Sequence, residues 1–172
     1  MMSRSIVVVI FIAMCCCKSN DPQIITAAPG TLVAYFDGVV KKSIKMRVAW
    51  PPNSSNFRET MYIQAYFKET DTTRIDCSVA TNNTKIPVTT GEYFFKGNDP
   101  LVAAPAFFYV PFDGKGAFTS QYFPEPIAGK VVISELDEVN KLVSGTFEVK
   151  LVRASEKLTI TKGSFNKIQY TP

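Results

Sequence analysis

The chain contains no histidine among its 172 residues, and it has only four cysteines. Without histidine, the commonest general base and a common nitrogen ligand for zinc are both missing. Three of the cysteines are consecutive, Cys15, Cys16 and Cys17, and the fourth is Cys77. A mature chain that began at Cys17 would keep a single further thiol, so no disulfide framework could form within it. These absences exclude histidine-dependent catalytic triads and disulfide-rich scaffolds.

Long apolar segments and dense basic clusters are missing as well. The longest apolar run covers residues 6–14, far fewer than the roughly 20 residues that a membrane-spanning helix needs. The formal net charge is only +4, and the longest basic run is Lys41-Lys42. A nucleic-acid-binding surface gathers Lys and Arg on one face. We therefore expect neither a membrane-spanning helix nor a nucleic-acid partner.

The N-terminus carries the pattern of an export signal. Arg4 precedes the apolar run, and the polar residues Lys18-Ser19-Asn20-Asp21 follow the three cysteines. A charged start, an apolar run of this length and a sudden change to polar residues are typical of a secretory signal peptide. We predict a lipoprotein signal peptide over residues 1–16, a lipidated cysteine with its tether over residues 17–30, and a single β domain over residues 31–172.

The residues around the cysteines resemble a lipobox, the motif at which a bacterial signal peptide is cut before a cysteine that receives lipid. Met14 departs from the motif, because a small residue is usual before the cysteine. Cys17 begins Cys-Lys-Ser-Asn-Asp, which is similar to the start of many Bacteroidota lipoproteins. The resemblance implies acylation of Cys17, with Cys15 and Cys16 as alternatives, and a lipid anchor in the outer membrane of the cell envelope, periplasmic or surface-exposed. Two acyl chains suffice for stable anchoring.

After the tether, alternation of apolar and polar residues with a period of two dominates the chain. Residues 61–68 and 143–151 alternate in this way, and Asp37-Gly38 is a tight-turn pair. Such alternation marks half-buried strands, and frequent turn signals favour an all-β domain. We predict an antiparallel β-sandwich of about nine or ten strands, with a small β-barrel as the alternative. The alternation slips near Gly163, which predicts a β-bulge there.

The C-terminal strands resemble an uncharacterised family of Bacteroidota lipoproteins. The residues that carry the resemblance are Ser144-Gly145-Thr146-Phe147 and Ile160-Thr161-Lys162-Gly163-Ser164-Phe165. Residues 33–39 match the first hairpin of the family more weakly, and Asn166 stands where an acidic residue is common. The resemblance implies an anchored, mostly β domain of unknown function, and it brings no known activity.

Consecutive aromatic residues place rings on both faces of several predicted strands. Tyr93, Phe95, Phe108 and Tyr122 are candidates for a surface that binds a sugar ring or a protein partner. The alternative is that one row of rings lies in the core and that the loop over residues 97–105 covers the other row.

The leading prediction is a non-enzymatic, lipid-anchored domain that binds an envelope protein or a glycan. Two alternatives stay open. An envelope enzyme that acts on glycans through paired carboxylates would need two acids in a cleft, one with a raised pKa. A barrel that carries a small apolar ligand would need an empty apolar cavity. The sequence singles out no catalytic residue, metal ligand or cofactor site, and alternation places Cys77 with Ile75 and Val79 as a small buried side chain.

Overall fold

The structure is a computed structural model that describes residues 25–49, 60–69, 73–80, 88–97 and 105–171. These residues form eleven β-strands and no helix, which confirms the all-β prediction. No helix that could cross a membrane is found in this part of the chain. The candidate lipidation sites Cys15, Cys16 and Cys17 lie outside the described residues.

The strands follow one another along the chain, joined in several places by tight turns. They are β1 (Thr31–Phe36), β2 (Val39–Lys42), β3 (Lys45–Ala49), β4 (Thr60–Tyr66), β5 (Arg74–Ala80), β6 (Gly91–Lys96), β7 (Ala106–Val110), β8 (Phe118–Thr119), β9 (Ile127–Asp137), β10 (Leu142–Arg153) and β11 (Glu156–Thr171).

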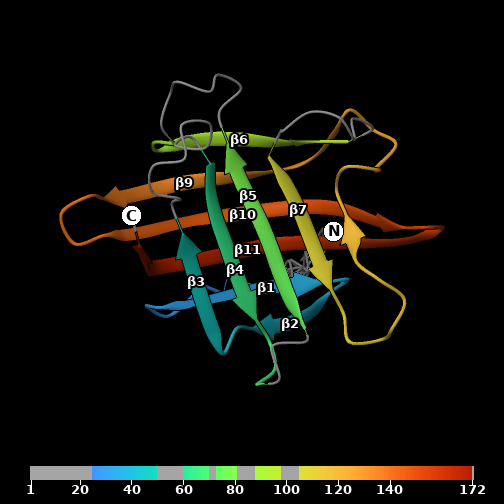
Figure 1. The fold of residues 1–172 in the computed structure, drawn as a ribbon, viewed down its shortest axis with the longest axis horizontal. Coiled ribbons are helices and arrows are strands. Elements are labelled where there is room, and N and C mark those ends of the chain that lie inside the picture. The colour runs from blue at the N-terminus through green and yellow to red at the C-terminus, as the bar shows by residue number, and fades with distance from the viewer. Residues whose placement is uncertain (1–24, 50–59, 70–72, 81–87, 98–104, 172) are drawn as a thin grey trace, which may run out of the picture.

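Figure 1 shows that the strands form two layers that cross each other. The short-strand layer consists of β3, β4, β5 and β7, which cross the front of the view roughly vertically and alternate in direction. The long-strand layer lies behind it and contains, in spatial order, β2, β1, β11, β10, β9 and β6. The core lies between the layers, as in a β-sandwich.

Hydrogen-bonded strands join the two layers on both sides. On one side β8 pairs with β7 and also, at Thr119↔Val152, with β10. On the other side the end of β11 pairs with β3 at Tyr170↔Val48. This pairing is parallel, whereas the other strand pairings in the described residues are antiparallel. The reason is the length of β11, which continues past its antiparallel partner β10 and reaches the other layer.

The predicted β-bulge near Gly163 is present. Between Gly163 and Ile160, two residues of β11 oppose one residue of β10, and Lys162 adopts a φ of 50°. Gly163 lies opposite Phe147, and a Cβ at this glycine would lie 2.5 Å from the Phe147 ring. Gly145 lies in the same way opposite Phe165. The motifs Ser-Gly-Thr-Phe and Ile-Thr-x-Gly-x-Phe therefore pair two aromatic rings with two glycines across β10 and β11, a known way to support glycine within a sheet.

Aromatic side chains fill the centre of the core. The ring of Phe107, in β7, lies 5.5 Å from that of Phe95 in β6 and 5.4 Å from that of Phe147 in β10, measured between centroids. The hollow that remains beside Phe107 and Phe147 has a volume of about 10 Å³, about that of one water molecule. At this point of the core there is thus no space for an apolar ligand.

Candidate functional site

The outer face of the short-strand layer carries side chains in three straight rows that cross its strands. The pairings β3–β4, β4–β5 and β5–β7 contain no register shift, so residues of equal height stay aligned from strand to strand. Side chains of every second residue share this face. The rows are Lys45, Tyr66, Arg74 and Val110; Arg47, Gln64, Asp76 and Phe108; and Ala49, Tyr62, Ser78 and Ala106.

A chain of hydrogen bonds connects polar side chains on this face. Nε of Arg74 lies 2.7 Å from Oδ2 of Asp76 in a salt bridge, and Nε2 of Gln64 donates to Oδ1 of Asp76 at 2.8 Å. The hydroxyl of Tyr66 donates to Oε1 of Gln64 at 3.2 Å. Each of these side chains is half-buried or buried, so the chain of hydrogen bonds holds them in fixed orientations at the surface.

Aromatic rings flank this polar chain. Tyr62 is 41% exposed and occupies the row next to Gln64 on the same strand, and half-buried Phe108 lies opposite Asp76. Over the ring of Tyr66, Nζ of Lys45 lies 5.6 Å and the guanidinium carbon of Arg47 5.9 Å from the centroid. The arrangement combines rings that can stack with planar polar groups that can form hydrogen bonds on their solvent side.

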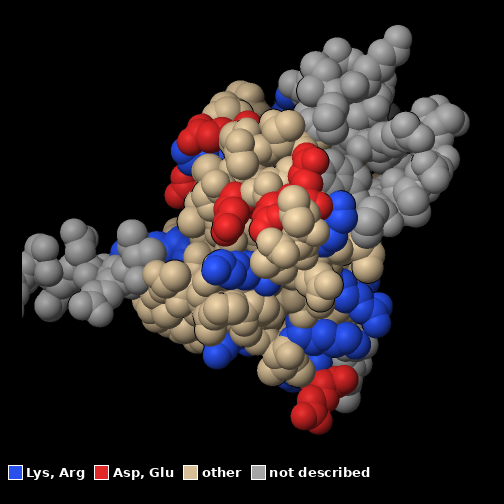
Figure 2. Space-filling model, turned by 90° about the vertical axis from the view of Figure 1, so that its left-hand side faces the viewer, with Lys and Arg blue, Asp and Glu red and all other residues tan. Residues whose placement is uncertain are grey.

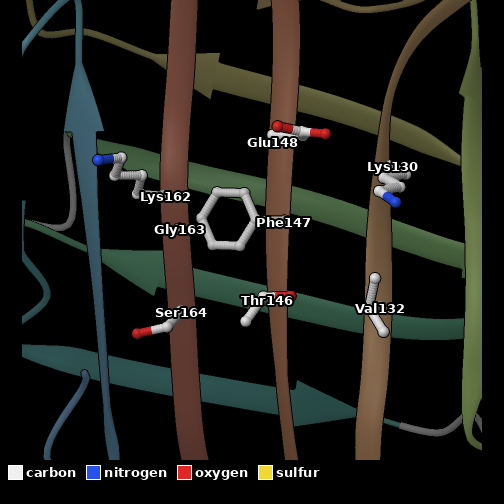
Figure 3. A pocket seen from close by; sticks show the side chains of 8 residues that line it. All are labelled: Lys130, Val132, Thr146, Phe147, Glu148, Lys162, Gly163 and Ser164. Carbon is white, nitrogen blue, oxygen red and sulfur yellow. The ribbon is translucent and has the colours of Figure 1, made fainter. Parts of the chain in front are cut away.

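The outer face of the long-strand layer is hollowed instead. A groove of about 310 Å³ crosses β9, β10 and β11 (Figure 3). Gly163 and Phe147 lie at its floor, and the only aromatic residue that lines it, Phe147, is buried. A second hollow of about 270 Å³ adjoins it and shares Glu148. The residues that line the groove are Lys130, Val132, Thr146, Phe147, Glu148, Lys162, Gly163 and Ser164.

The charges that line these hollows are largely matched. Lys130 forms a salt bridge with Glu92 at 2.9 Å, and Lys150 forms one with Glu125 at 3.0 Å. The hydrogen bond and the charge of Glu92 raise the pKa of Lys130, which keeps this side chain protonated. The long-strand face therefore has a groove but neither an exposed ring within it nor a large excess of one charge.

The N-terminal segment packs on this same long-strand face. The N–H of Ala27 donates to Oγ of Ser164 at 3.0 Å, and Nδ2 of Asn166 donates to the carbonyl of Ala27 at 3.1 Å. Ser164 also lines the groove. The first described residues of the chain thus lie on the layer opposite the Tyr62 face.

The structure places the four aromatic candidates at different sites. Phe95 is fully buried between the layers, so its ring is not open to a ligand, and its neighbour Phe94 is exposed instead. Tyr93 is half-buried, and its hydroxyl is hydrogen-bonded to the backbone of Thr89. Tyr122 is 64% exposed in a turn after β8. Phe108 alone lies on the short-strand face.

The runs of aromatic residues in the sequence do not point to Tyr62, Gln64 or Asp76 as site residues. Their signal is the polar phase of the alternation in β4 and β5, which contains Tyr62-x-Gln64-x-Tyr66 and Arg74-x-Asp76. Runs of consecutive aromatic residues drew attention to other strands, whereas the face is built by single rings that the register brings together.

Paired carboxylates with the properties of a glycosidase pair are not found in the described residues. Asp113 and Glu156 meet at Arg153, which is 2.6 Å from Oδ2 of Asp113 and 2.7 Å from Oε2 of Glu156. The pKa of Asp113 is lowered by the backbone N–H of Lys115 and then by Arg153, and the pKa of Glu156 is lowered by Arg153. A general acid needs a raised pKa, whereas both carboxyls here have a lowered one. We therefore interpret the cluster as a contact that stabilises the turns.

No other chemistry stands out in the described part of the chain. It contains no group of three or more acidic, cysteine or histidine side chains that could hold a metal ion. Cys77 is a buried free thiol, as alternation predicts, and burial raises its pKa well above the usual value. A thiol of this kind is unreactive.

Comparisons with known proteins give no relative for this chain: no protein family, no curated protein and no solved structure matches it. The resemblance of its C-terminal strands to Bacteroidota lipoproteins therefore stays a prediction. Function has to be inferred from the two faces themselves.

Proposed function

We propose that this chain is a lipid-anchored binding domain of the cell envelope that holds a glycan on the outer face of its short-strand layer. The observation that carries the proposal is the chain of hydrogen bonds from Arg74 through Asp76 and Gln64 to Tyr66, flanked by the rings of Tyr62 and Phe108. Sugars offer apolar C–H faces to aromatic rings and hydroxyls to planar polar groups.

The lipid anchor is part of the proposal, with Cys17 as the acylated residue and Cys15 and Cys16 as alternatives. It rests on the signal-peptide pattern at the N-terminus. The packing of Ala27 on the long-strand layer places the start of the described chain on the side of the domain opposite the Tyr62 face.

The binding function is tested with the full chain, purified in detergent, on an array of neutral and acidic glycans. We expect binding to a subset of glycans and a loss of about fivefold in affinity for Tyr62→Ala, because stacking on one ring contributes about 1 kcal/mol. Phe94→Ala is the matched control, since Phe94 is 46% exposed but belongs to the long-strand layer.

Two results would contradict the proposal in different ways. Equal binding by the native protein and Tyr62→Ala would move the site away from this face. Absence of binding to every glycan on the array would overturn the glycan function and leave a protein partner as the alternative.

The anchor is tested separately, by intact mass and membrane fractionation of the native protein and of Cys17→Ala. An acylated chain that begins at Cys17, and release of the variant from membranes, are the expected results. A variant that stays acylated would assign the lipid to Cys15 or Cys16, and an unmodified native chain would remove the anchor from the proposal.

A further inference from the structure

The Tyr62 face has an excess of positive charge among its described residues. Its three rows contain the cations Lys45, Arg47 and Arg74 but only one carboxylate, that of Asp76. Both oxygens of Asp76 are already engaged, one by Gln64 and the other by Arg74. Among the residues that the structure describes, the rows of this face therefore carry more cations than carboxylates.

The long-strand face offers the internal comparison. There, Glu92 and Glu125 pair with Lys130 and Lys150, and Glu148 lies between the two hollows. Lysines on that face are thus accompanied by nearly as many carboxylates. The charge excess belongs to the short-strand face and follows from its own residues, not from a general surplus of lysine.

The cations lie on one side of the exposed ring, along the direction of the strands. Lys45 pairs with Tyr66 and Arg47 with Gln64, whereas Tyr62 lies one row further along β4. From Tyr62 to Tyr66 the strand extends about 14 Å, at roughly 3.4 Å per residue. A polymer that stacks one ring on Tyr62 and runs along β4 therefore passes directly over the cationic rows.

We infer that the ligand of this face is an acidic polysaccharide with carboxylates on its sugar rings. One ring stacks on Tyr62, and the carboxylates of the following rings bind at Arg47, Lys45 and Arg74. This inference rests on the proposed glycan function and specifies its ligand class. Guanidinium groups suit carboxylates because they donate two parallel hydrogen bonds in one plane.

The test compares acidic polymers with their own uncharged derivatives. The full chain in detergent is titrated with polygalacturonate, alginate and hyaluronate, and with the methyl ester of each. We expect at least one acid to bind about tenfold more tightly than its ester, since a hydrogen bond to a charged group is stronger than one to a neutral group. Added salt weakens binding of the acid but not of the ester.

Paired variants assign the effect to this face. Lys45→Gln with Arg47→Gln removes two positive charges from the Tyr62 face, and we expect the acid to bind about tenfold more weakly while the ester is unaffected. Lys130→Gln with Lys150→Gln removes the same charge from the long-strand face and is expected to leave both affinities unchanged.

The outcomes separate this inference from the proposed function. Equal affinity for acids and esters overturns the acidic ligand and leaves the glycan function standing. Binding of neutral glycans on the array without binding of any of the acids has the same meaning. Equal binding of polyglutamate and the acidic glycans also overturns it, because charge alone would then explain the affinity. Absence of binding to every glycan overturns both.

Discussion

The long-strand layer contains four glycines within its strands, Gly91, Gly129, Gly145 and Gly163, whereas the short-strand layer contains none. The register shifts are distributed in the same way. They occur between β1 and β11, β10 and β11, β9 and β10, and β6 and β9, but not between β3, β4, β5 and β7. Bulges bend a strand, and glycines leave space where side chains would stand.

These differences decide what each outer face can do. The long-strand layer, which contains the register shifts, carries a groove on its outer face that Gly163 and Phe147 help to line (Figure 3). In the short-strand layer, an unbroken register aligns Arg47, Gln64 and Asp76 in one row. The long-strand face thus has a hollow without exposed rings, whereas the short-strand face has an ordered array of side chains that includes exposed rings. The short-strand face is better suited to bind a sugar chain.

Acidic and basic side chains are also unevenly distributed over the surface of the domain. Figure 2 looks from the side where β3 and the β9–β10 hairpin lie, and there acidic side chains gather mainly in the upper half and basic side chains in the lower half. Glu135, Asp137 and Glu138 belong to β9 and the turn that follows it, whereas Lys45 and Arg47 belong to β3. On this side of the domain, acidic and basic side chains are therefore partly segregated among the described residues.

The largest expected effect comes from the contact that joins the two layers. Phe107→Ala removes the ring that β7 places between Phe95 and Phe147. We expect the free energy of unfolding to fall by about 4 kcal/mol, the usual cost of a buried phenylalanine replaced by alanine. Urea unfolding followed by fluorescence measures it. A loss below about 1 kcal/mol would mean that the layers do not depend on this cluster.

A second effect tests the glycine pattern of the long-strand layer. In Gly145→Ala the new Cβ would lie 2.5 Å from Cζ of Phe165 and even closer to the backbone oxygen of Val132. We expect a loss of about 2 kcal/mol from overpacking. Thr146→Ala, at the next and exposed position, is the control and should change stability by less than about 0.5 kcal/mol. Equal stability of both variants would refute the role assigned to the Gly145–Phe165 contact.

Much of the fold could be predicted because local sequence patterns, such as alternation and turn pairs, specify strands and turns. Alternation predicted β4 and β10, and the slip in β11 predicted the bulge beside Gly163. The turn at Asp37-Gly38 is present with φ angles of 46° and 84°, values that glycine and aspartate tolerate. What local pattern does not contain is the parallel pairing of Tyr170 with Val48, which joins residues far apart in the chain.

The candidate site was harder to predict, for a related reason. In β6 both phases of the alternation carry aromatic rings, so hydrophobicity could not decide that Phe95 turns inward and Phe94 outward. The contact with Phe107 across the core decides it. On the short-strand face, the row of Gln64 and Asp76 depends on the register between β4 and β5, which single-strand periodicity does not specify.

A smaller effect should appear in acid, and it belongs to carboxylates at the turns that follow β7, β9 and β10. The pKa values of Asp113, Asp137 and Glu156 are lowered, the first by the backbone N–H of Lys115, the second by that of Asn140 and the third by Arg153. A lowered pKa contributes stability above the ordinary carboxyl pKa of about 4, and this contribution is lost as the pH falls through the folded-state value.

Arg153→Gln isolates part of this acid sensitivity. The variant should be less stable than the native protein at pH 7, and the difference should shrink as the pH falls through the lowered pKa values of Asp113 and Glu156, because both carboxyls then lose their charge in the native protein too. Urea midpoints at several pH values measure it. A difference that stays constant with pH would show that Arg153 acts through its packing on the Phe118 ring, 4.2 Å from the guanidinium carbon.

The smallest expected effect concerns the variants that test the ligand. Arg47→Gln removes a contact with Tyr66 at 5.9 Å on an exposed strand, and a cation–π contact at such a site contributes only about 0.5 kcal/mol. The unfolding midpoint should therefore hardly move, while binding of an acidic glycan falls. This separation follows from the unbroken register of the short-strand layer, since an outward side chain there can change without disturbing Val48, its inward neighbour in β3. Thermal unfolding checks it, and a large loss of stability would show that the Tyr66 cluster holds the layer together and is not reserved for a ligand.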